Sequence, residues 1–136
     1  MAWVFDASIA MAWCFEDEKT PQTETLPNRL LTKDSAIVPQ IFPLEVGNVL
    51  TLALRKGRIS SAERAEFLEL LRAASIAIDP HTASRALTTI LPLAETHQLT
   101  TYDASYLELA MRLGVPLATL DKNLRRAAED AGAELL

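Results

Sequence analysis

Residues 99–124 read LTTYDASYLELAMRLGVPLATLDKNL, and this stretch decides the fold. The segments 98–100 and 116–120 are typical of strands, and each precedes an Asp at the start of a helical pattern. The first of these helical patterns ends at Gly114, a residue suited to closing a helix. If the two strands are parallel neighbours, Asp103 and Asp121 emerge at the carboxyl edge of one sheet, where open α/β folds build their sites.

The remaining chain alternates between strand-like and helix-like segments. Further strands are expected at residues 2–5, 36–38 and 75–78. Helices are expected at residues 6–15, 23–33, 43–55, 60–73, 82–97, 102–113 and 121–130. A capping box starts the fourth helix, and Pro92 kinks or splits the fifth. The third is apolar nearly all round, which predicts that it is buried. This alternation predicts right-handed βαβ units, and hence one three-layer α/β domain spanning residues 1–136.

Composition narrows the class of protein. The chain is 49% hydrophobic and 23% charged, as globular proteins usually are. Its single cysteine excludes an internal disulfide, its first residues lack a signal-peptide pattern, and no apolar run is long enough to span a bilayer. We therefore expect a soluble cytoplasmic protein with no membrane partner. The net charge of −5 argues against a protein that coats nucleic acid. It leaves open a nucleic-acid enzyme whose acidic site is compensated by metal.

Three aspartates directly follow expected strands: Asp6, Asp103 and Asp121. Taken singly, each is explained equally well as a helix cap or first-turn residue, worth about 1 kcal/mol. Caps would be served as well by Ser, Thr or Asn, which this chain uses elsewhere. Three acids at one edge of the same sheet therefore favour a shared site.

Glu45 is a fourth acid of interest because it interrupts the most apolar helix, with Asn48 three residues on and so on the same face. A buried Glu is costly unless it pairs with a cation such as Arg or binds metal. Converging carboxylates also repel each other, by about 4 kcal/mol for a pair about 4 Å apart at an effective dielectric constant of about 20. Divalent cations relieve such repulsion, and Mg²⁺ or Mn²⁺ suits a site made of carboxylates.

Four segments carry a resemblance to a known family. They are DAS (6–8), PLEVGNVL (43–50), TYDASYLELA (101–110) and ATLDKNL (118–124). Their order and spacing resemble the PIN domain nucleases and, more narrowly, the VapC toxins of toxin–antitoxin pairs. The resemblance implies a Rossmann-like α/β/α domain with a mainly parallel sheet of about five strands. It also implies an endoribonuclease that depends on Mg²⁺ or Mn²⁺.

The functional positions of the family carry over residue by residue. Its acidic quartet falls on Asp6, Glu45, Asp103 and Asp121. Its supporting polar positions fall on Ser8, Asn48 and Thr119. Such a site would hold a divalent ion through Asp6 and Asp103, with Asp121 bound directly or through water, while Glu45 would hold a water or a second ion. The resemblance also implies a homodimer inhibited by a small antitoxin. We expect such an inhibitor to bind an apolar groove near the acids, between the helices at 6–15, 23–33 and 43–55.

Two basic groups are candidates for contacts with the RNA backbone. One surrounds the turn at Gly57 and consists of Arg55, Lys56 and Arg58. The other consists of Lys122, Arg125 and Arg126, which share one face of the last helix. An ordinary solvated surface explains the second group equally well. Among the aromatic residues, Trp3 and Tyr102 could stack on bases, although packing is the expected role of both.

Three other classes of protein remain as alternatives. A phosphatase or phospho-receiver domain would need two adjacent acids after the first strand, where Asp6 stands alone. A dinucleotide-binding domain would need a glycine-rich turn there, and the sequence DASIAM contains no glycine. A catalytically silent PIN domain that only binds or regulates is the third, and the four intact acids argue against it.

Overall fold

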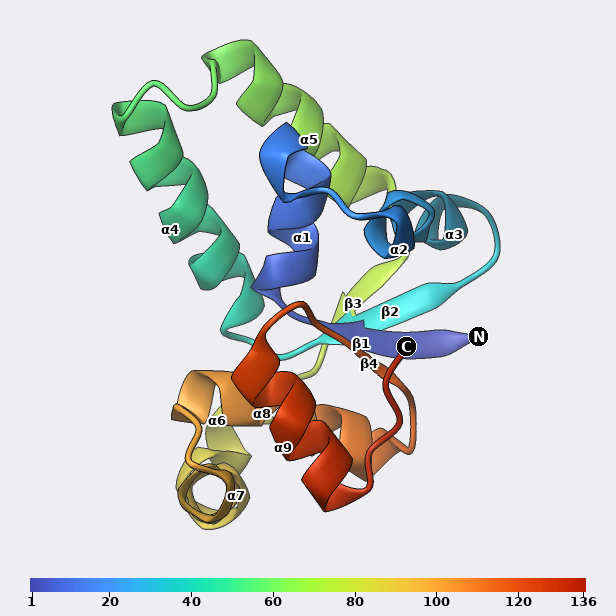
Figure 1. Ribbon diagram of the computed structural model, residues 1–136, viewed down its shortest axis with the longest axis vertical. Coiled ribbons are helices and arrows are strands. Elements are labelled where there is room, and N and C mark those ends of the chain that lie inside the picture. The colour runs from blue at the N-terminus through green and yellow to red at the C-terminus, as the bar shows by residue number, and fades with distance from the viewer.

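The sheet is built around its first strand. In the computed structural model, which describes residues 1–136, β1 (Ala2–Phe5) pairs in parallel with β2 (Ser35–Val38) and with β4 (Leu117–Ala118). β3 (Ile76–Ile78) pairs in parallel with β2 and forms an edge, which gives the order β3-β2-β1-β4 (Figure 1). The predicted parallel sheet is therefore confirmed, and so are the strands predicted at residues 2–5, 36–38, 75–78 and 116–120.

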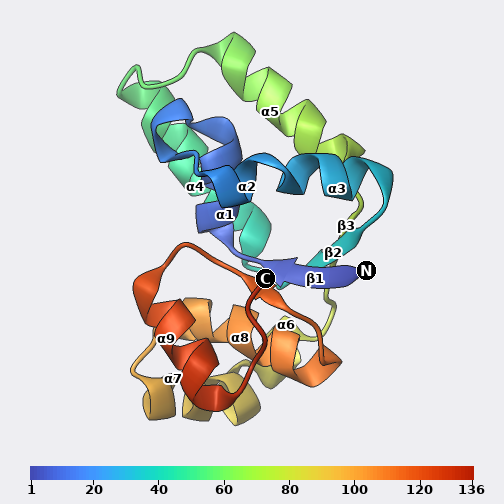
Figure 2. The ribbon, with the colours of Figure 1, turned by 45° about the vertical axis from the view of Figure 1, so that its right-hand side comes forward.

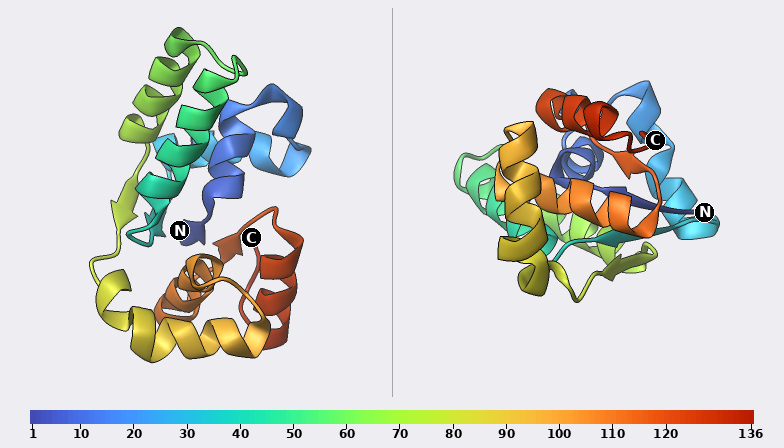
Figure 3. Two further views of the ribbon diagram at one scale, coloured as in Figure 1. Left: turned by 90° about the vertical axis from the view of Figure 1, so that its left-hand side faces the viewer. Right: turned by 90° about the horizontal axis from the view of Figure 1, so that it is seen from below.

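Helices cover both faces of this sheet in a three-layer α/β/α arrangement (Figures 1 and 2). One layer contains α1 (Ala7–Cys14), η1 (Glu16–Glu18), α2 (Pro21–Glu24), α3 (Leu26–Thr32), α4 (Phe42–Arg55) and α5 (Ser61–Ala73). The other contains α6 (Thr82–Arg85), the π-helical segment η2 (Ala86–Ile90), α7 (Leu91–His97), α8 (Thr101–Leu113) and α9 (Lys122–Ala131). Figure 3 shows both layers from two further directions. None of these helices has the length and apolar composition needed to cross a membrane.

The strand predicted at residues 98–100 is absent, so the sheet has four strands rather than about five. α7 ends at Gln98, whose backbone is left-handed with φ 56°. The N–H of Leu99 still bonds back into α7, and Thr100 already caps α8. The prediction was wrong because the ends of two consecutive helices use all three residues, which leaves none to pair with a strand.

Local sequence signals set other helix ends as predicted. Ser60 and Glu63 each accept a hydrogen bond from the backbone N–H of the other, which is the capping box expected at the start of α5. Gly114 ends α8 with φ 65°, a conformation that a residue without Cβ adopts at little cost. The helix predicted at 82–97 is divided into α6, η2 and α7. The division falls just before Pro92, which has no N–H to donate to the preceding turn.

The main core surrounds β1, whose side chains meet helices on both faces of the sheet. Trp3, Val4 and Phe5 have no exposed surface. The Phe5 ring lies 5.1 Å from the ring of Phe42 in α4 and 5.0 Å from that of Trp13 in α1, measured between centroids. Aromatic packing of this kind fixes the carboxyl end of β1, and Asp6 follows directly.

α4 is only half buried, contrary to the prediction for the helix at 43–55. Val46 and Leu50 pack into the core, whereas Leu44 is 71% exposed and Leu52 is 42% exposed. The helix lies at the outer edge of its layer beside α1 (Figure 1), so it has a neighbour along one side only. Apolar residues therefore reach the surface there, because burial depends on what surrounds a helix as well as on its composition.

A buried network of ion pairs fixes α8 against the turn after β3. Asp79 and Glu108 are 3% and 4% exposed. Arg112 bonds both of them, through Nη2 to Asp79 Oδ2 at 2.6 Å and through Nε to Glu108 Oε1 at 2.9 Å. Arg85 of α6 adds a second contact to Glu108 at 2.5 Å. Because α8 begins at the acidic cluster described below, this network also fixes part of the candidate site.

Candidate active site

Asp6 is the most enclosed acid of the predicted quartet, with 4% of its surface exposed. It caps α1, since its Oδ1 accepts the backbone N–H groups of Ser8 at 3.1 Å and Ile9 at 3.4 Å. The Ser8 hydroxyl also donates to Oδ1, and the Thr119 hydroxyl donates to Oδ2, both at 2.5 Å. Burial raises the pKa of Asp6, and the bonds from the two hydroxyls oppose that rise.

Two hydroxyls join the turn after β1 to the turn after β4. The Thr119 hydroxyl that donates to Asp6 also accepts the backbone N–H of Asp121 at 3.0 Å. The Ser8 hydroxyl accepts the backbone N–H of Leu120 at 2.9 Å. Ser8 and Thr119, predicted as supporting residues, therefore hold the first and last acids of the quartet in one hydrogen-bonded unit.

Asp103 and Asp121 differ in their local roles. Asp121 caps α9, because its Oδ1 accepts the N–H of Leu124 at 2.9 Å. Asp103 lies in the first turn of α8 and is not the cap, which is Thr100. Burial first, and then the negative charges of the other three acids, raise the pKa of Asp103 from 3.8 to about 6. Asp103 is therefore a first-turn residue rather than the cap of α8, whereas the other two aspartates are caps as well as members of the cluster.

Glu45 joins the cluster from the first turn of α4. The buried Tyr106 hydroxyl of α8 donates to Glu45 Oε1 at 2.5 Å. Burial raises the pKa of Glu45, the Tyr106 bond opposes this, and the charge of Asp6 adds to it. Asn48 lies one turn further along α4, but it is exposed and makes no side-chain hydrogen bond.

Tyr106 is a site residue that was not predicted from the sequence. Burial and the nearby charge of Glu45 raise its pKa above the ordinary tyrosine value, so it remains a hydrogen-bond donor. A tyrosine one helical turn after Asp103, at a position where Phe or Leu would pack as well, was the available signal.

The four acids share one electrostatic environment but do not form a ready-made ligand set. No three His, Cys, Asp or Glu side chains lie close enough together to hold a metal ion. Like charges repel, and the Asp6 oxygens are already occupied by donors. The available ligand atoms are carboxylate oxygens, which Mg²⁺ and Mn²⁺ prefer. The raised pKa of Asp103 reflects burial first and then repulsion by the other acids, and a cation would relieve that repulsion.

The predicted basic groups lie in different surroundings. Arg55, Lys56 and Arg58 lie at the far end of α4 from Glu45, about 15 Å away at 1.5 Å per residue. Arg58 is also paired with Asp17 at 2.9 Å and with Glu18 at 2.6 Å.

Of the group on α9, only one side chain reaches the acidic end of the sheet. Arg125 donates to the Thr119 carbonyl at 3.1 Å, whereas Arg126 donates to the His97 carbonyl at 3.2 Å and Lys122 is exposed. Among the aromatic residues, Trp3 packs as expected. Tyr102 does not, because it is 58% exposed beside Asp103.

The fold and the acidic cluster define a class of protein. The model of the PIN domain family matches residues 3–130, so the chain belongs to the PIN domain family. Within that family it is similar to Ribonuclease VapC3 of Pyrobaculum aerophilum, with 33% identity over 127 residues that cover 91% of this chain and 92% of that protein. The resemblance drawn from the four sequence segments is therefore confirmed.

Solved structures agree with this assignment. The crystal structure of PAE2754 from Pyrobaculum aerophilum matches with a TM-score of 0.68 and 25% identity, covering 93% of this chain and 87% of that one. VapBC2 from Rickettsia felis, solved bound to a DNA fragment from its promoter, matches with a TM-score of 0.64 and 13% identity, covering 93% and 92%. The second likeness shows the fold alone.

Proposed function

We propose that this protein is a VapC-type toxin that hydrolyses RNA phosphodiester bonds with the help of Mg²⁺ or Mn²⁺. The single observation that carries the proposal is the cluster of four carboxylates at the carboxyl edge of the sheet, in which the other three acids help raise the pKa of Asp103 to about 6. The similarity to a protein named Ribonuclease VapC3 supports RNA as the substrate. Family membership makes the receiver and dinucleotide-binding alternatives unnecessary.

The acids of the cluster would hold the cation, with Asp6, Asp103 and Asp121 as ligands and Glu45 near a water or a second ion. A bound divalent ion would neutralise the scissile phosphate and lower the pKa of a water for attack on phosphorus.

The chain's own residues prepare this arrangement in stated ways. Ser8 and Thr119 fix the orientation of Asp6, because each donates to one of its two oxygens. Tyr106 orients Glu45, because its hydroxyl donates to Glu45 Oε1. With a pKa of about 6, Asp103 is mainly ionised at pH 7 and is available as a ligand, although it must lose its proton first in more acidic solution.

Partners and location form part of the proposal. The Rickettsia felis VapBC2 likeness supports a search for a cognate antitoxin encoded beside this chain. Leu44 and Leu52 on the outer side of α4 are apolar and exposed, as a protein–protein contact requires. We propose that such surfaces serve the antitoxin and a homodimer, and that the protein acts in the cytoplasm.

The experiment that tests the proposal is RNA cleavage by the purified protein, with the cation as the variable. EDTA should abolish cleavage, and Mg²⁺ or Mn²⁺ should restore it better than Ca²⁺ does, with 5′-phosphate ends on the products. Asp6→Asn should lose activity by orders of magnitude. Asp130→Asn makes the same charge change at an exposed position of α9 and should keep activity. Full cleavage in EDTA would exclude the metal-dependent mechanism.

A catalytically silent PIN module remains the second candidate, and one observation favours it: no three acids lie in ligand geometry. That reading predicts no cleavage of RNA under any cation. It also predicts no stabilisation by Mn²⁺, whereas a metal site raises the free energy of unfolding as RT ln(1 + [L]/Kd). Thermal melting with increasing Mn²⁺ therefore separates the two candidates even without a substrate.

A further inference from the structure

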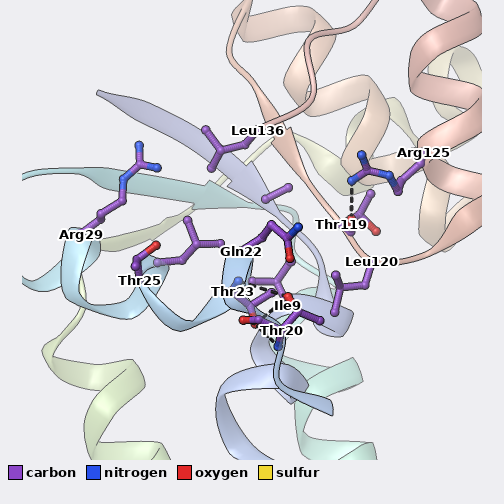
Figure 4. Close-up of a pocket in the computed structure, with 12 residues that line it drawn as sticks. Ile9, Thr20, Gln22, Thr23, Thr25, Arg29, Thr119, Leu120, Arg125 and Leu136 are labelled. Carbon is purple, nitrogen blue, oxygen red and sulfur yellow. Dashed lines mark hydrogen bonds between the residues drawn. The ribbon is translucent and has the colours of Figure 1, made fainter.

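A pocket of about 510 Å³ opens beside the acidic cluster, between the α2–α3 segment and the turn from β4 to α9. Figure 4 shows Gln22, Thr25 and Arg29 on one side, and Thr119, Leu120 and Arg125 on the other. The pocket has the volume of a site for a small molecule or one unit of a polymer. It is continuous with the cluster because Thr119, which lines it, donates to Asp6.

The charge of the pocket is opposite to that of the whole protein. The chain has a net charge of −5, yet the twelve residues that line the pocket include two arginines and no carboxylate side chain. Arg29 is already neutralised, since its Nε lies 2.6 Å from Asp34. Arg125 is half-buried and makes no ion pair; its one bond goes to the Thr119 carbonyl at 3.1 Å. A partly desolvated guanidinium of this kind is available for an anionic group.

The other lining groups suit the remainder of a nucleotide. The Gln22 amide lines the pocket without a hydrogen bond in the chain, and the Thr25 hydroxyl caps no helix, so both can bind an added molecule. Ile9 and Leu26 provide a buried apolar floor. The apolar surface suits the face of a base, the amide suits the hydrogen-bonding edge of that base, and the cation suits the phosphate of the same nucleotide.

We infer that this pocket binds the nucleotide next to the scissile phosphate of the RNA, with Arg125 contacting the phosphate and Gln22 the base edge. The inference rests on the proposed function of the acidic cluster, and it adds a residue that influences sequence preference. An acidic peptide is a less suitable occupant, because the pocket offers one unpaired cation and continues directly to the site where phosphate would react.

The test combines binding and cleavage by the whole chain. Binding of a fluorescein-labelled single-stranded RNA is measured by anisotropy in the Asp103→Asn background, where cleavage is slow. Arg125→Ala should weaken binding roughly tenfold, because a hydrogen bond to a charged group contributes about 1.5 kcal/mol or more. Arg125→Lys, which keeps the charge without the planar fork, should lose less. With Asp103 intact, Arg125→Ala should raise KM more than it lowers kcat.

Two further variants make the result specific. Arg64→Ala removes a half-buried arginine of α5 that makes no ion pair and lies outside the pocket, so it should leave binding within twofold. Gln22→Ala should change the cleavage-site sequences on a pool of RNAs while leaving the melting temperature unchanged.

Three outcomes would overturn the inference. Arg125→Ala and Arg64→Ala could weaken RNA binding equally, which would show that binding depends on the overall charge of the protein and not on the pocket. Gln22→Ala and Arg125→Ala could leave RNA binding intact but abolish inhibition by a co-purified antitoxin, which would assign the pocket to a peptide. If the wild-type chain cleaves RNA and both variants keep its KM and sequence preference, the pocket inference is refuted and the proposed function stands. If the wild-type chain does not cleave RNA, the proposed function itself is refuted.

Discussion

Replacing Asp103 with Asn should stabilise the protein at neutral pH when metal is absent. The folded carboxyl group has a pKa of about 6, raised from 3.8, so between these pH values the folded state binds more protons than the unfolded state. The contribution of Asp103 to stability is therefore complete below pH 4 and is lost as the pH rises through about 6. At pH 7 the cost of burying an ionised carboxylate and the repulsion by its neighbours both remain, and the neutral amide removes them.

The size of the effect follows from the same pKa values. The rise from 3.8 to about 6 corresponds to about 3 kcal/mol, which solvent screening at this partly exposed position reduces to about 1–2 kcal/mol. Asn also loses the favourable interaction of a carboxylate with the first turn of α8, worth about 0.3–1 kcal/mol. No cap is lost, because Thr100 caps that helix. The net gain of about 1 kcal/mol should raise the melting temperature by roughly 3–5 °C in a domain of this size.

Thermal unfolding followed by circular dichroism in EDTA measures this difference directly. The variant should melt higher than wild type at pH 7 and lose its advantage at pH 4. Added Mn²⁺ should stabilise wild type much more than the variant, which should also cleave RNA orders of magnitude more slowly. A variant that melts lower at pH 7 without metal, and still cleaves RNA at a near wild-type rate, would show that Asp103 is only a first-turn residue.

Three other substitutions address contacts described above. Tyr106→Phe removes the hydroxyl that donates to Glu45, so we expect a loss of about 1–2 kcal/mol in urea unfolding and a severalfold fall in cleavage rate; an unchanged rate would separate this bond from activity. Arg112→Ala leaves buried Asp79 without its ion-pair partner and leaves Glu108 with Arg85 alone, so it should cost about 3 kcal/mol, whereas a cost below about 1 kcal/mol would mean that water replaces the guanidinium. Tyr102→Ala changes an exposed ring and should leave the melting temperature unchanged while weakening RNA binding severalfold; equal binding would argue against base stacking there.

The sequence predicted those features that depend on interactions between residues close together in the chain. The acids at positions 6, 103 and 121 were identifiable because each stands at the start of a helical pattern. The capping box of α5 and the division before Pro92 are equally local and were predicted correctly. The helix ends at Gln98 and Thr100 were misread as a strand, because three residues carry too little periodicity to distinguish the two structures.

The parts of the site that could not be predicted depend on distant neighbours. The hydrogen bond between Tyr106 and Glu45 joins residues 61 positions apart, and no pattern in either helix predicts that these two residues pair. Exposure of Leu44 follows from the place of α4 at the edge of its layer, which composition does not encode. The same holds for Arg125: the sequence grouped it with Lys122 and Arg126, but the pocket it lines is made by segments about a hundred residues away.

The bond between Thr119 and Asp6 has a consequence for synthesis of the protein. β1 is made first, but its pairing partner β4 and the hydroxyl that holds Asp6 are made more than a hundred residues later, since Asp6 and Thr119 lie 113 positions apart. A nascent chain whose residues 117–121 are still inside the ribosome therefore has an Asp6 whose Oδ2 lacks its hydroxyl donor, and no Asp121 beside it. If the proposed activity is correct, the chain cannot cut RNA until residues 117–121 have left the ribosome and folded against β1.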